Sequence, residues 1–336
     1  MMTPQCSKIL LISDTLTSTC LKDEIDYTAI TPLNYWYHLL RRDKFDFLLV
    51  ESSWSGYKNR WKYKIASYPD YPKRNNNALA RVVDMAKDKG VPTVFWNRED
   101  NVHFERFIKS AKLFDHILTV DENCVKRYKE IVPASVSVNV APFCIQPKIH
   151  NFSGFNFKSN TANFIGSYNT QIHDRRRSWQ HMLFEAALRA KLPLTVIDRN
   201  SERKAKNYRY PLEQYNLRVN PSIPYAKTAD IYKDYLISLN VNTIENSPTA
   251  YSRRLVEILA CGGIAVSTPS LAVEKIFKDY CIVVNSLDEA IEVFSRLKHG
   301  ASKSDLERAK AGSDFVLNNL TWRQFIDKVY EIIYKH

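Results

Sequence analysis

The segment Thr249–Gly263, TAYSRRLVEILACGG, holds the residues whose types and spacing best suit chemistry. Arg253 and Glu257 are four residues apart and Arg254 and Glu257 three apart, so on a helix both arginines lie near one carboxylate. Guanidinium groups make charge-assisted hydrogen bonds with phosphate oxygens. A carboxylate placed beyond them can accept hydrogen bonds from both hydroxyls of a ribose. The alternative interpretation is an Arg/Glu pair on the solvent-exposed face of an ordinary helix.

The position of this helix favours the chemical interpretation. It follows NVNTIENSPT, which comes after a predicted strand at 236–242. The helix therefore begins at the carboxyl end of a strand, where its free N–H groups and the positive end of its dipole suit a diphosphate. The glycine pair at its end allows a tight turn into the next strand.

A second glycine-containing segment, FIGSYN at 164–169, precedes the basic sequence HDRRRSW at 173–179. Gly166 permits close approach of the backbone, Ser167 can donate to a phosphate, and the three arginines add positive potential at the next helix start. A glycine turn followed by a solvated basic segment is the alternative. Tyr225, in IPYAKTADIYKDYL, is a candidate contact for a nucleobase.

The first half of the chain offers candidates for a general base that would deprotonate a hydroxyl. In order of preference they are Glu51, Asp100, Glu99 and His103, each just after a predicted strand. Acidic residues also favour helix starts, and a lone histidine is often structural. Aromatic residues crowd the same half between Trp54 and Tyr71, which is typical of a loop that stacks on sugars or lipid, or of a loop that is simply well packed.

The elements that must position these residues alternate along the chain. Strands are predicted at 8–12, 45–50, 92–96, 116–120 and 136–141, and again at 162–167, 192–198, 236–242, 263–268 and 281–284. Helices are predicted at 77–89, 102–113, 178–190, 226–235, 252–261, 287–297, 304–318 and 321–334. Buried strands separated by helices indicate parallel sheets built from βαβ units. We expect an α/β protein with two doubly wound, Rossmann-like domains, a linker near 142–161 and a ligand cleft between the domains.

Composition limits the partners. The net charge of +12 indicates an anionic partner, which could be a phosphorylated ligand, a membrane surface or nucleic acid. We predict no nucleic-acid partner, because the arginines cluster at helix starts and no motif of that class is present. The six cysteines show no metal spacing, and the sequence has no signal or membrane-spanning pattern. A cytoplasmic protein is expected, with peripheral contact to the anionic inner membrane face as a further possibility.

These motifs together resemble the GT-B glycosyltransferases, and most closely the spore-maturation-protein-related (CgeB-like) group. The resemblance spans nearly the whole chain, through VESSWSG (50–56), VFWNREDNVHFERF (94–107), FDHILTVDENCVKRY (114–128), PFCIQPKIHN (142–151), FIGSYN (164–169), SPTAYSRRLVEILACGG (247–263) and NNLTWRQFIDKVYEII (318–333). It implies an acceptor domain at 1–148 and a donor domain at 149–320, with the C-terminal helix, about 321–336, packing back onto the first. The residues it implies at the nucleotide sugar are Gly166, Ser167, Tyr225, Thr249, Tyr251, Ser252, Arg253, Arg254 and Glu257.

One position departs from the pattern of these enzymes. Many retaining relatives carry a second Glu eight residues before the ribose-binding one, and here that residue is Thr249. No Asp-x-Asp sequence occurs, so the helix dipole and arginines would replace a metal ion in neutralising the diphosphate. We therefore predict a metal-independent transferase that needs no cofactor and moves a sugar, most plausibly from a UDP-sugar, to a glycan, lipid-linked or protein acceptor in surface-polysaccharide or envelope synthesis. The alternatives are a non-catalytic sugar-nucleotide-binding protein and, ranked below it, a basic nucleic-acid-binding protein.

Overall fold

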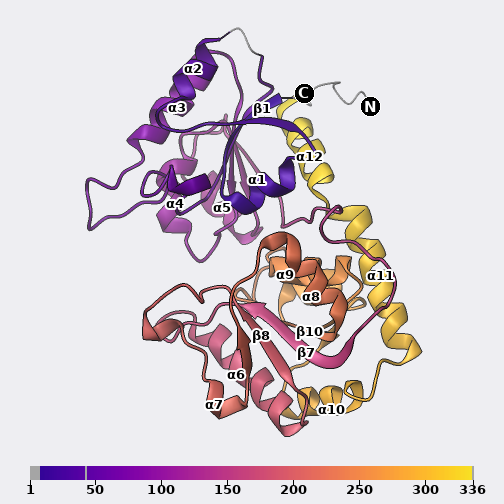
Figure 1. Ribbon diagram of the computed structural model, residues 1–336. Helices are drawn as coiled ribbons and strands as arrows, with labels where there is room; N and C mark the ends of the chain where they lie inside the picture. Colours follow the sequence, from indigo (N-terminus) through magenta and orange to yellow (C-terminus); the bar gives the residue numbers. More distant parts are fainter. Residues whose placement is uncertain (1–7, 42–43, 335–336) are drawn as a thin grey trace. The chain divides into compact units, whose positions relative to one another are not determined.

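The computed structural model describes residues 8–41 and 44–334, which fall into two compact units. Unit 1 extends to Pro142 and also includes the chain from Trp322 onward, and unit 2 is Phe143–Thr321. Each unit contains one six-stranded parallel sheet with helices on both faces (Figure 1). The predicted α/β class with two doubly wound sheets is therefore confirmed. None of the helices in the described part of the chain combines the length and hydropathy that crossing a bilayer requires.

The sheet of unit 1 has the order β2-β1-β3-β4-β5-β6. Its strands are β1 (Lys8–Ile12), β2 (Asp26–Ala29), β3 (Leu48–Glu51), β4 (Thr93–Asn97), β5 (His116–Thr119) and β6 (Ser137–Val140). Its helices are α1 (Thr15–Leu21), α2 (Tyr35–Leu40), α3 (Asn77–Asp88), α4 (Phe104–Ala111), α5 (Asn123–Lys129) and α12 (Trp322–Tyr334). The central strands are apolar on both faces because both faces are covered.

Alternate residues of these strands face different helices. Leu48 and Val50 belong to the core cluster that includes residues of α3 and α4. Phe47 and Trp96 face the other way and meet α12, where the Trp96 and Trp322 rings contact edge to face at 5.5 Å between centroids. The C-terminal helix is thus part of the unit 1 core.

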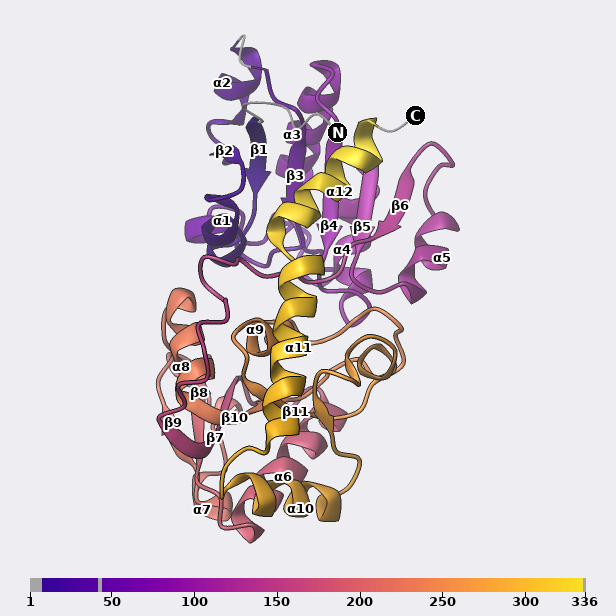
Figure 2. The same cartoon turned by 90° about the vertical axis from the view of Figure 1, so that its right-hand side faces the viewer.

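The sheet of unit 2 has the order β12-β11-β10-β7-β8-β9 (Figure 2). Its strands are β7 (Ser159–Gly166), β8 (Leu194–Asp198), β9 (Arg218–Asn220), β10 (Tyr235–Asn240), β11 (Ile264–Ser267) and β12 (Ile282–Val283). Its α-helices are α6 (Asp174–Arg189), α7 (Leu212–Tyr215), α8 (Thr228–Asp234), α9 (Arg253–Ala260), α10 (Leu287–Leu297) and α11 (Lys303–Asn319). Helices α6 and α10 contribute to one core cluster, and α8 and α9 to the cluster on the opposite face.

The strand order of unit 2 indicates where a ligand is expected to bind. The chain winds outward from β7 to β9 and then returns to add β10, β11 and β12 on the other side of β7. Parallel sheets bind ligands beyond the carboxyl ends of the strands where the winding reverses. Here that point lies between Gly166, at the end of β7, and Asn240, at the end of β10, and α9 begins shortly after it.

The segment 142–161, predicted as a linker, belongs largely to unit 2. Ile145, Gln146 and His150 are fully buried, and Phe152 lies against Gly262. Gly262 adopts φ +73° just after α9, and a β-carbon there would lie 2.5 Å from the Phe152 ring. The amide of Gly263 donates to the carbonyl of Ile258 at 3.0 Å, which completes the expected glycine-terminated helix end.

Candidate functional site

Glu257 lies in the second turn of α9 and is only 4% exposed. The Nε of Arg253 donates to its Oε1 at 2.9 Å, and the hydroxyl of Tyr232 donates to its Oε2 at 3.3 Å. Burial alone would raise the pKa of this carboxyl, but Arg253 and its other polar neighbours hold the pKa below its ordinary value. Glu257 is therefore an ionised, buried acceptor, and the alternative of a surface Arg/Glu pair is wrong.

Tyr225 and His150 complete the surroundings of this carboxylate. Their ring centroids are 5.2 Å apart, and the guanidinium of Arg253 lies 5.6 Å from the Tyr225 ring. The Thr228 hydroxyl donates to the Tyr225 carbonyl, so its oxygen accepts from Nε2 of His150 at 2.9 Å. We assign the imidazole proton to Nε2 on this basis. Nδ1 of His150 is then a buried acceptor that has no hydrogen-bond partner among the described residues.

Arg254 reaches from the first turn of α9 to the end of β7. Its Nε donates to the carbonyl of Ile165, and its guanidinium lies 4.4 Å from the centre of the Phe164 ring. A β-carbon on Gly166 would lie 2.4 Å from that ring and 3.2 Å from Nη2 of Arg254. Gly166 therefore admits the arginine side chain to this strand end. Nη1 of Arg254 is buried and lacks a partner in the described chain.

Three arginines at this edge of the sheet have no carboxylate within ion-pair distance among residues 8–41 and 44–334. They are Arg176, Arg199 and Arg254, whereas the neighbouring Arg175 and Arg177 pair with Glu245 and Asp174.

Burial, and to a lesser extent the charges of neighbouring arginines, lower the pKa values of Arg176, Arg199 and Arg254. Burial lowers the pKa of Arg254 to about 10, and the charge of Arg176 contributes. The pKa of Arg199 is also lowered, by the protein atoms that displace water around it and by Arg253 and Arg254. A compact cluster of arginines in which none has a carboxylate within ion-pair distance in the described chain favours a bound anion.

The loop before α9 is held by polar residues that the sequence analysis did not select. The Ser247 hydroxyl accepts from the amide of Ala250 at 2.9 Å, and Oδ1 of Asn242 accepts from the amide of Ser252 at 3.3 Å. Ser252 precedes the helix without a hydrogen bond from its side chain to the first turn. Thr249 and Ser252 are half-buried in this loop.

Tyr251 does not face the loop. It is 5% exposed, and its hydroxyl donates to the carbonyl of Phe143 at 2.6 Å. We expected it at the nucleotide sugar, but its ring packs against Phe277 in the core of unit 2. Its side chain therefore anchors the loop before α9 to the core of unit 2.

The first-choice base, Glu51, is a buried structural residue. It is 1% exposed and accepts hydrogen bonds from the amide of Asp14 and, at 2.5 Å, from the Thr17 hydroxyl. Nη1 of Arg98 lies 3.6 Å from its Oε2. Burial raises the pKa of Glu51 to about 7. Its carboxylate holds the turn before α1 and leaves no face for a substrate hydroxyl, which corrects our expectation.

Asp100 is also internal. It is 2% exposed and accepts from Asn97, Thr119 and Tyr128 at 2.7 to 2.9 Å. Burial raises the pKa of Asp100 to about 7. Because both of its oxygens are occupied by protein donors, we assign it to the packing of this loop and not to catalysis.

His103 keeps access to solvent. Its side chain is 32% exposed, its Nε2 lies 4.0 Å from Glu99, and its ring meets Trp54 edge to face at 5.1 Å. Burial lowers the pKa of His103 below 6.5, so the ring is neutral at pH 7. Among Glu51, Asp100 and His103, the histidine alone is both accessible to solvent and in the neutral form that a general base needs, although we ranked it last.

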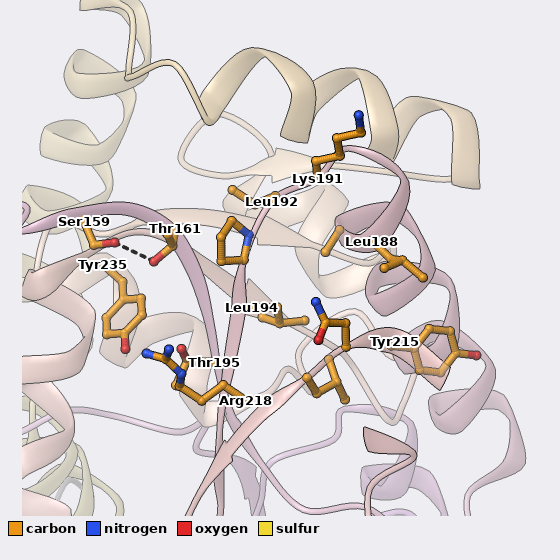
Figure 3. A pocket seen from close by; sticks show the side chains of 14 residues that line it. Ser159, Thr161, Leu188, Lys191, Leu192, Leu194, Thr195, Tyr215, Arg218 and Tyr235 are labelled. Atoms are coloured by element: carbon orange, nitrogen blue, oxygen red, sulfur yellow. Dashed lines mark hydrogen bonds between the residues drawn. The ribbon is translucent and has the colours of Figure 1, made fainter. Parts of the chain in front are cut away.

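A hollow of about 860 Å³ lies at the opposite, amino-terminal edge of the unit 2 sheet (Figure 3). It is lined by the first residues of several strands, among them Ser159, Thr161 and Leu194, and by Lys191 and Arg218. None of the arginines of the cluster and none of the residues around Glu257 line it. The hollow is therefore distinct from the candidate site, which rests on the charged residues at the carboxyl edge of the sheet.

Comparisons with known proteins concern the family and the fold. A family model described as "Glycosyl transferase-like" matches residues 175–331, which include α9 and most of unit 2. No curated protein matches the sequence. Among solved structures, a glycosyltransferase from Rickettsia africae aligns over 99% of this chain and 100% of its own, at 12% identity and a TM-score of 0.58.

The chain has the GT-B glycosyltransferase fold. HepE from Anabaena, solved with UDP-glucose, aligns over 98% of this chain and 92% of its own, at 11% identity and a TM-score of 0.59. Sucrose-phosphate synthase from Thermosynechococcus elongatus aligns over 86% and 74%, at 11% identity and a TM-score of 0.54. The family match and the fold together support the interpretation that the protein is a glycosyltransferase enzyme. Assignment to the CgeB-like group stays a prediction.

Proposed function

We propose that the protein transfers a sugar from a nucleotide diphosphate donor to a hydroxyl acceptor. The observation that carries this proposal is the position of Arg176, Arg199 and Arg254, none of which has a carboxylate within ion-pair distance in the described chain. They lie near the ionised Glu257, on the helix that begins where the winding of the unit 2 sheet reverses. A nucleoside diphosphate offers both the negative charge that the arginines lack and hydroxyl donors for the carboxylate.

In this proposal the diphosphate lies between the start of α9 and the end of β7. Arg254 and Arg176 donate to its oxygens, and the half-buried Ser167 supplies a hydroxyl. The uncapped first turn of α9 adds its N–H groups. These groups stabilise the negative charge that develops on the leaving diphosphate, so we propose that transfer needs no metal ion.

The nucleoside end of the donor is assigned to Glu257 and Tyr225. Glu257 accepts from the ribose hydroxyls through lone pairs that Arg253 and Tyr232 leave free, and Tyr225 meets the base. We propose a UDP-sugar donor. Support comes from the similarity to HepE, which is solved with UDP and with UDP-glucose.

The acceptor side is assigned to unit 1, with His103 as the base if the reaction inverts the anomeric centre. We propose a glycan or lipid-linked acceptor in surface-polymer synthesis. A cytoplasmic location is supported by Cys124, Cys261 and Cys281, which are buried thiols outside any disulfide.

Binding of UDP in the presence of EDTA tests the donor site by calorimetry. Glu257→Gln should weaken UDP binding about 10- to 100-fold, because hydrogen bonds to a charged group each contribute about 1.5–3 kcal/mol. Inorganic pyrophosphate should bind the variant as well as or better than wild type, since Arg253 is released from its carboxylate partner. The matched control is Glu185→Gln, a half-buried carboxylate of unit 2 that is paired with Arg189.

Unchanged UDP affinity in Glu257→Gln would refute the donor assignment. Loss of UDP binding on adding EDTA would refute metal independence. Incubation with a panel of UDP-, GDP-, CDP- and dTDP-sugars then separates the two remaining functions. Release of the nucleotide diphosphate identifies a transferase or hydrolase, whereas tight binding without turnover identifies a non-catalytic sugar-nucleotide-binding protein.

A further inference from the structure

The segment 33–40 of unit 1 exposes an unusual amount of apolar surface. Leu33 is 75% exposed, Trp36 50%, Tyr37 45% and Leu40 58%. Elsewhere in the described chain, large exposed apolar side chains stand singly, which is normal for a soluble surface. Four exposed apolar side chains within eight residues, on and beside α2, indicate a surface that contacts a membrane or another protein.

This segment is firmly held by the fold and is not a loose loop. Leu39, on the same helix, is 5% exposed and belongs to the unit 1 core with Tyr35 packed against it. Asn34 accepts from the amide and the hydroxyl of Thr31 at 2.7 and 2.9 Å. Helix α2 packs against α3 in unit 1 (Figure 1). The outward direction of Trp36 and Leu40 is therefore a property of the folded unit.

The polar atoms of the exposed aromatic rings are already satisfied within the segment. The indole N–H of Trp36 donates to the carbonyl of Leu33 at 2.9 Å. The hydroxyl of Tyr37 accepts from Arg41, whose guanidinium lies 5.0 Å from the Tyr37 ring centre. Both rings can move from water into an apolar medium without losing a hydrogen bond, which removes the main cost of that transfer.

Cations adjoin the apolar residues. The sequence from Thr31 to Leu40 contains no acidic residue, and it is followed by Arg41, Arg42 and Lys44 against the single Asp43. A second basic segment lies nearby and exposes Lys58, Arg60 and Lys62. The Trp61 indole of this segment donates to the carbonyl of Ile30 at 2.9 Å, and Ile30 directly precedes Thr31.

We propose that Leu33, Trp36, Tyr37 and Leu40 insert into the headgroup region of a bilayer with anionic lipids, with Arg41 and Lys44 at the phosphates. Aromatic rings beside leucines and basic residues have the composition of interfacial membrane-binding segments. An anionic bilayer satisfies the apolar side chains and the cations together. This surface is separate from the donor site, so the proposal stands or falls independently of the proposed function.

Vesicle flotation of the full chain tests the proposal. Wild type should float with vesicles of phosphatidylcholine and phosphatidylglycerol, and more weakly with phosphatidylcholine alone. The triple variant Leu33→Ser, Trp36→Ser, Leu40→Ser should partition at least about tenfold less. Arg41→Gln with Lys44→Gln should lose about fivefold for each cation on anionic vesicles only. The matched control is Leu188→Ser with Leu212→Ser, which removes exposed leucines of unit 2.

Trp36 also provides a direct readout, because it is the most exposed of the six tryptophans. Anionic vesicles should shift its emission to the blue and protect it from acrylamide, and this change should be absent in Trp36→Phe. Circular dichroism checks that the variants fold. Flotation of the triple variant equal to wild type would overturn the proposal. So would absence of flotation, or a concentration-dependent dimer that the triple variant abolishes while vesicles have no effect, since the occupant would then be a second copy.

Discussion

Replacing Arg254 by Met should weaken ligand binding far more than it changes the stability of the free protein. The pKa of this buried arginine falls from 12.5 to about 10. Because the folded-state pKa of a base is lowered, the charged form is disfavoured by folding, at a cost of about 3 kcal/mol at neutral pH. Methionine removes this cost and keeps most of the apolar stem that packs on Phe164.

The substitution also removes favourable contacts. The hydrogen bond to the Ile165 carbonyl contributes about 1.5–3 kcal/mol and the ring contact about 0.5–2 kcal/mol. These losses nearly offset the recovered charge cost, so the free energy of unfolding without ligand should stay within about 2 kcal/mol of wild type. A diphosphate, in contrast, loses one charge-assisted partner, which raises its Kd about 10- to 100-fold.

Urea unfolding with and without UDP measures both quantities. At a UDP concentration of about 100 times the wild-type Kd, the ligand should add about 2.7 kcal/mol to wild type. A variant with Kd about 30-fold weaker gains about 1 kcal/mol at the same concentration. Arg189→Met, at an exposed arginine paired with Glu185, is the control and should gain as much as wild type. An undiminished gain in Arg254→Met would refute the anion site, and a loss above about 3 kcal/mol without ligand would make this arginine structural.

Two further predictions concern pH. Burial lowers the pKa of His103 from its ordinary value, so kcat/KM of an inverting transferase should fall as the pH decreases through this lowered pKa and the ring gains its proton. His103→Gln should lower kcat about 100- to 10,000-fold and remove this acidic limb; an unchanged pH profile would exclude His103 as the base. Burial would raise the pKa of Asp305, but Arg296 and Ser302 lower it to about 2, from 3.8. This depressed carboxyl should stabilise the fold by about 2 kcal/mol above pH 4, and that contribution should be lost as the pH falls through 2. Asp305→Asn should therefore cost about 2 kcal/mol at pH 7 and almost nothing at pH 2, and urea unfolding at both values checks this; an equal loss at both would show that the charge is not the cause.

Apolar periodicity was sufficient to predict the elements that form the cores. The strand at 8–12 and the helix at 287–297 have the predicted bounds, and most others differ by one to four residues at an end. The sequence analysis missed β2 and β9, which are short and partly exposed, so that a buried apolar run is absent. It also missed α1, α2, α5 and α7, which are all seven residues or fewer and too short to show a helical period.

The contacts of the candidate site were predictable only where they join residues close together in the sequence. Arg253 and Glu257 form the i, i+4 pair that their spacing on one helix allows. In contrast, nothing in the row of Arg175, Arg176 and Arg177 distinguishes its members. Arg175 forms an ion pair with Glu245, which lies 70 residues away in the sequence. The hydrogen bond of Arg176 within the described chain goes to the backbone carbonyl of Ser167. Long-range packing thus decides which arginine stays available to a ligand.

The same distinction applies to the acidic candidates. The sequence predicted Glu51 just past a strand, whereas it is the last residue of β3, and it predicted Asp100 after a strand, where it follows the end of β4 by three residues. At neither position could the sequence separate a catalytic carboxylate from a buried one. That difference arises from Thr17, Arg98, Thr119 and Tyr128, which come from other elements and occupy the carboxylate oxygens.

The sequence by itself determined two parallel sheets and a glycine-terminated helix with arginines and a glutamate at ligand-binding spacing, because these depend on residues close together in the chain. The tertiary structure decided which charges are compensated, which carboxylates are enclosed and which apolar side chains point outward. Whether a charge has a counter-charge, and whether a carboxylate is buried, depends on side chains from distant segments. Only the folded chain brings those side chains together.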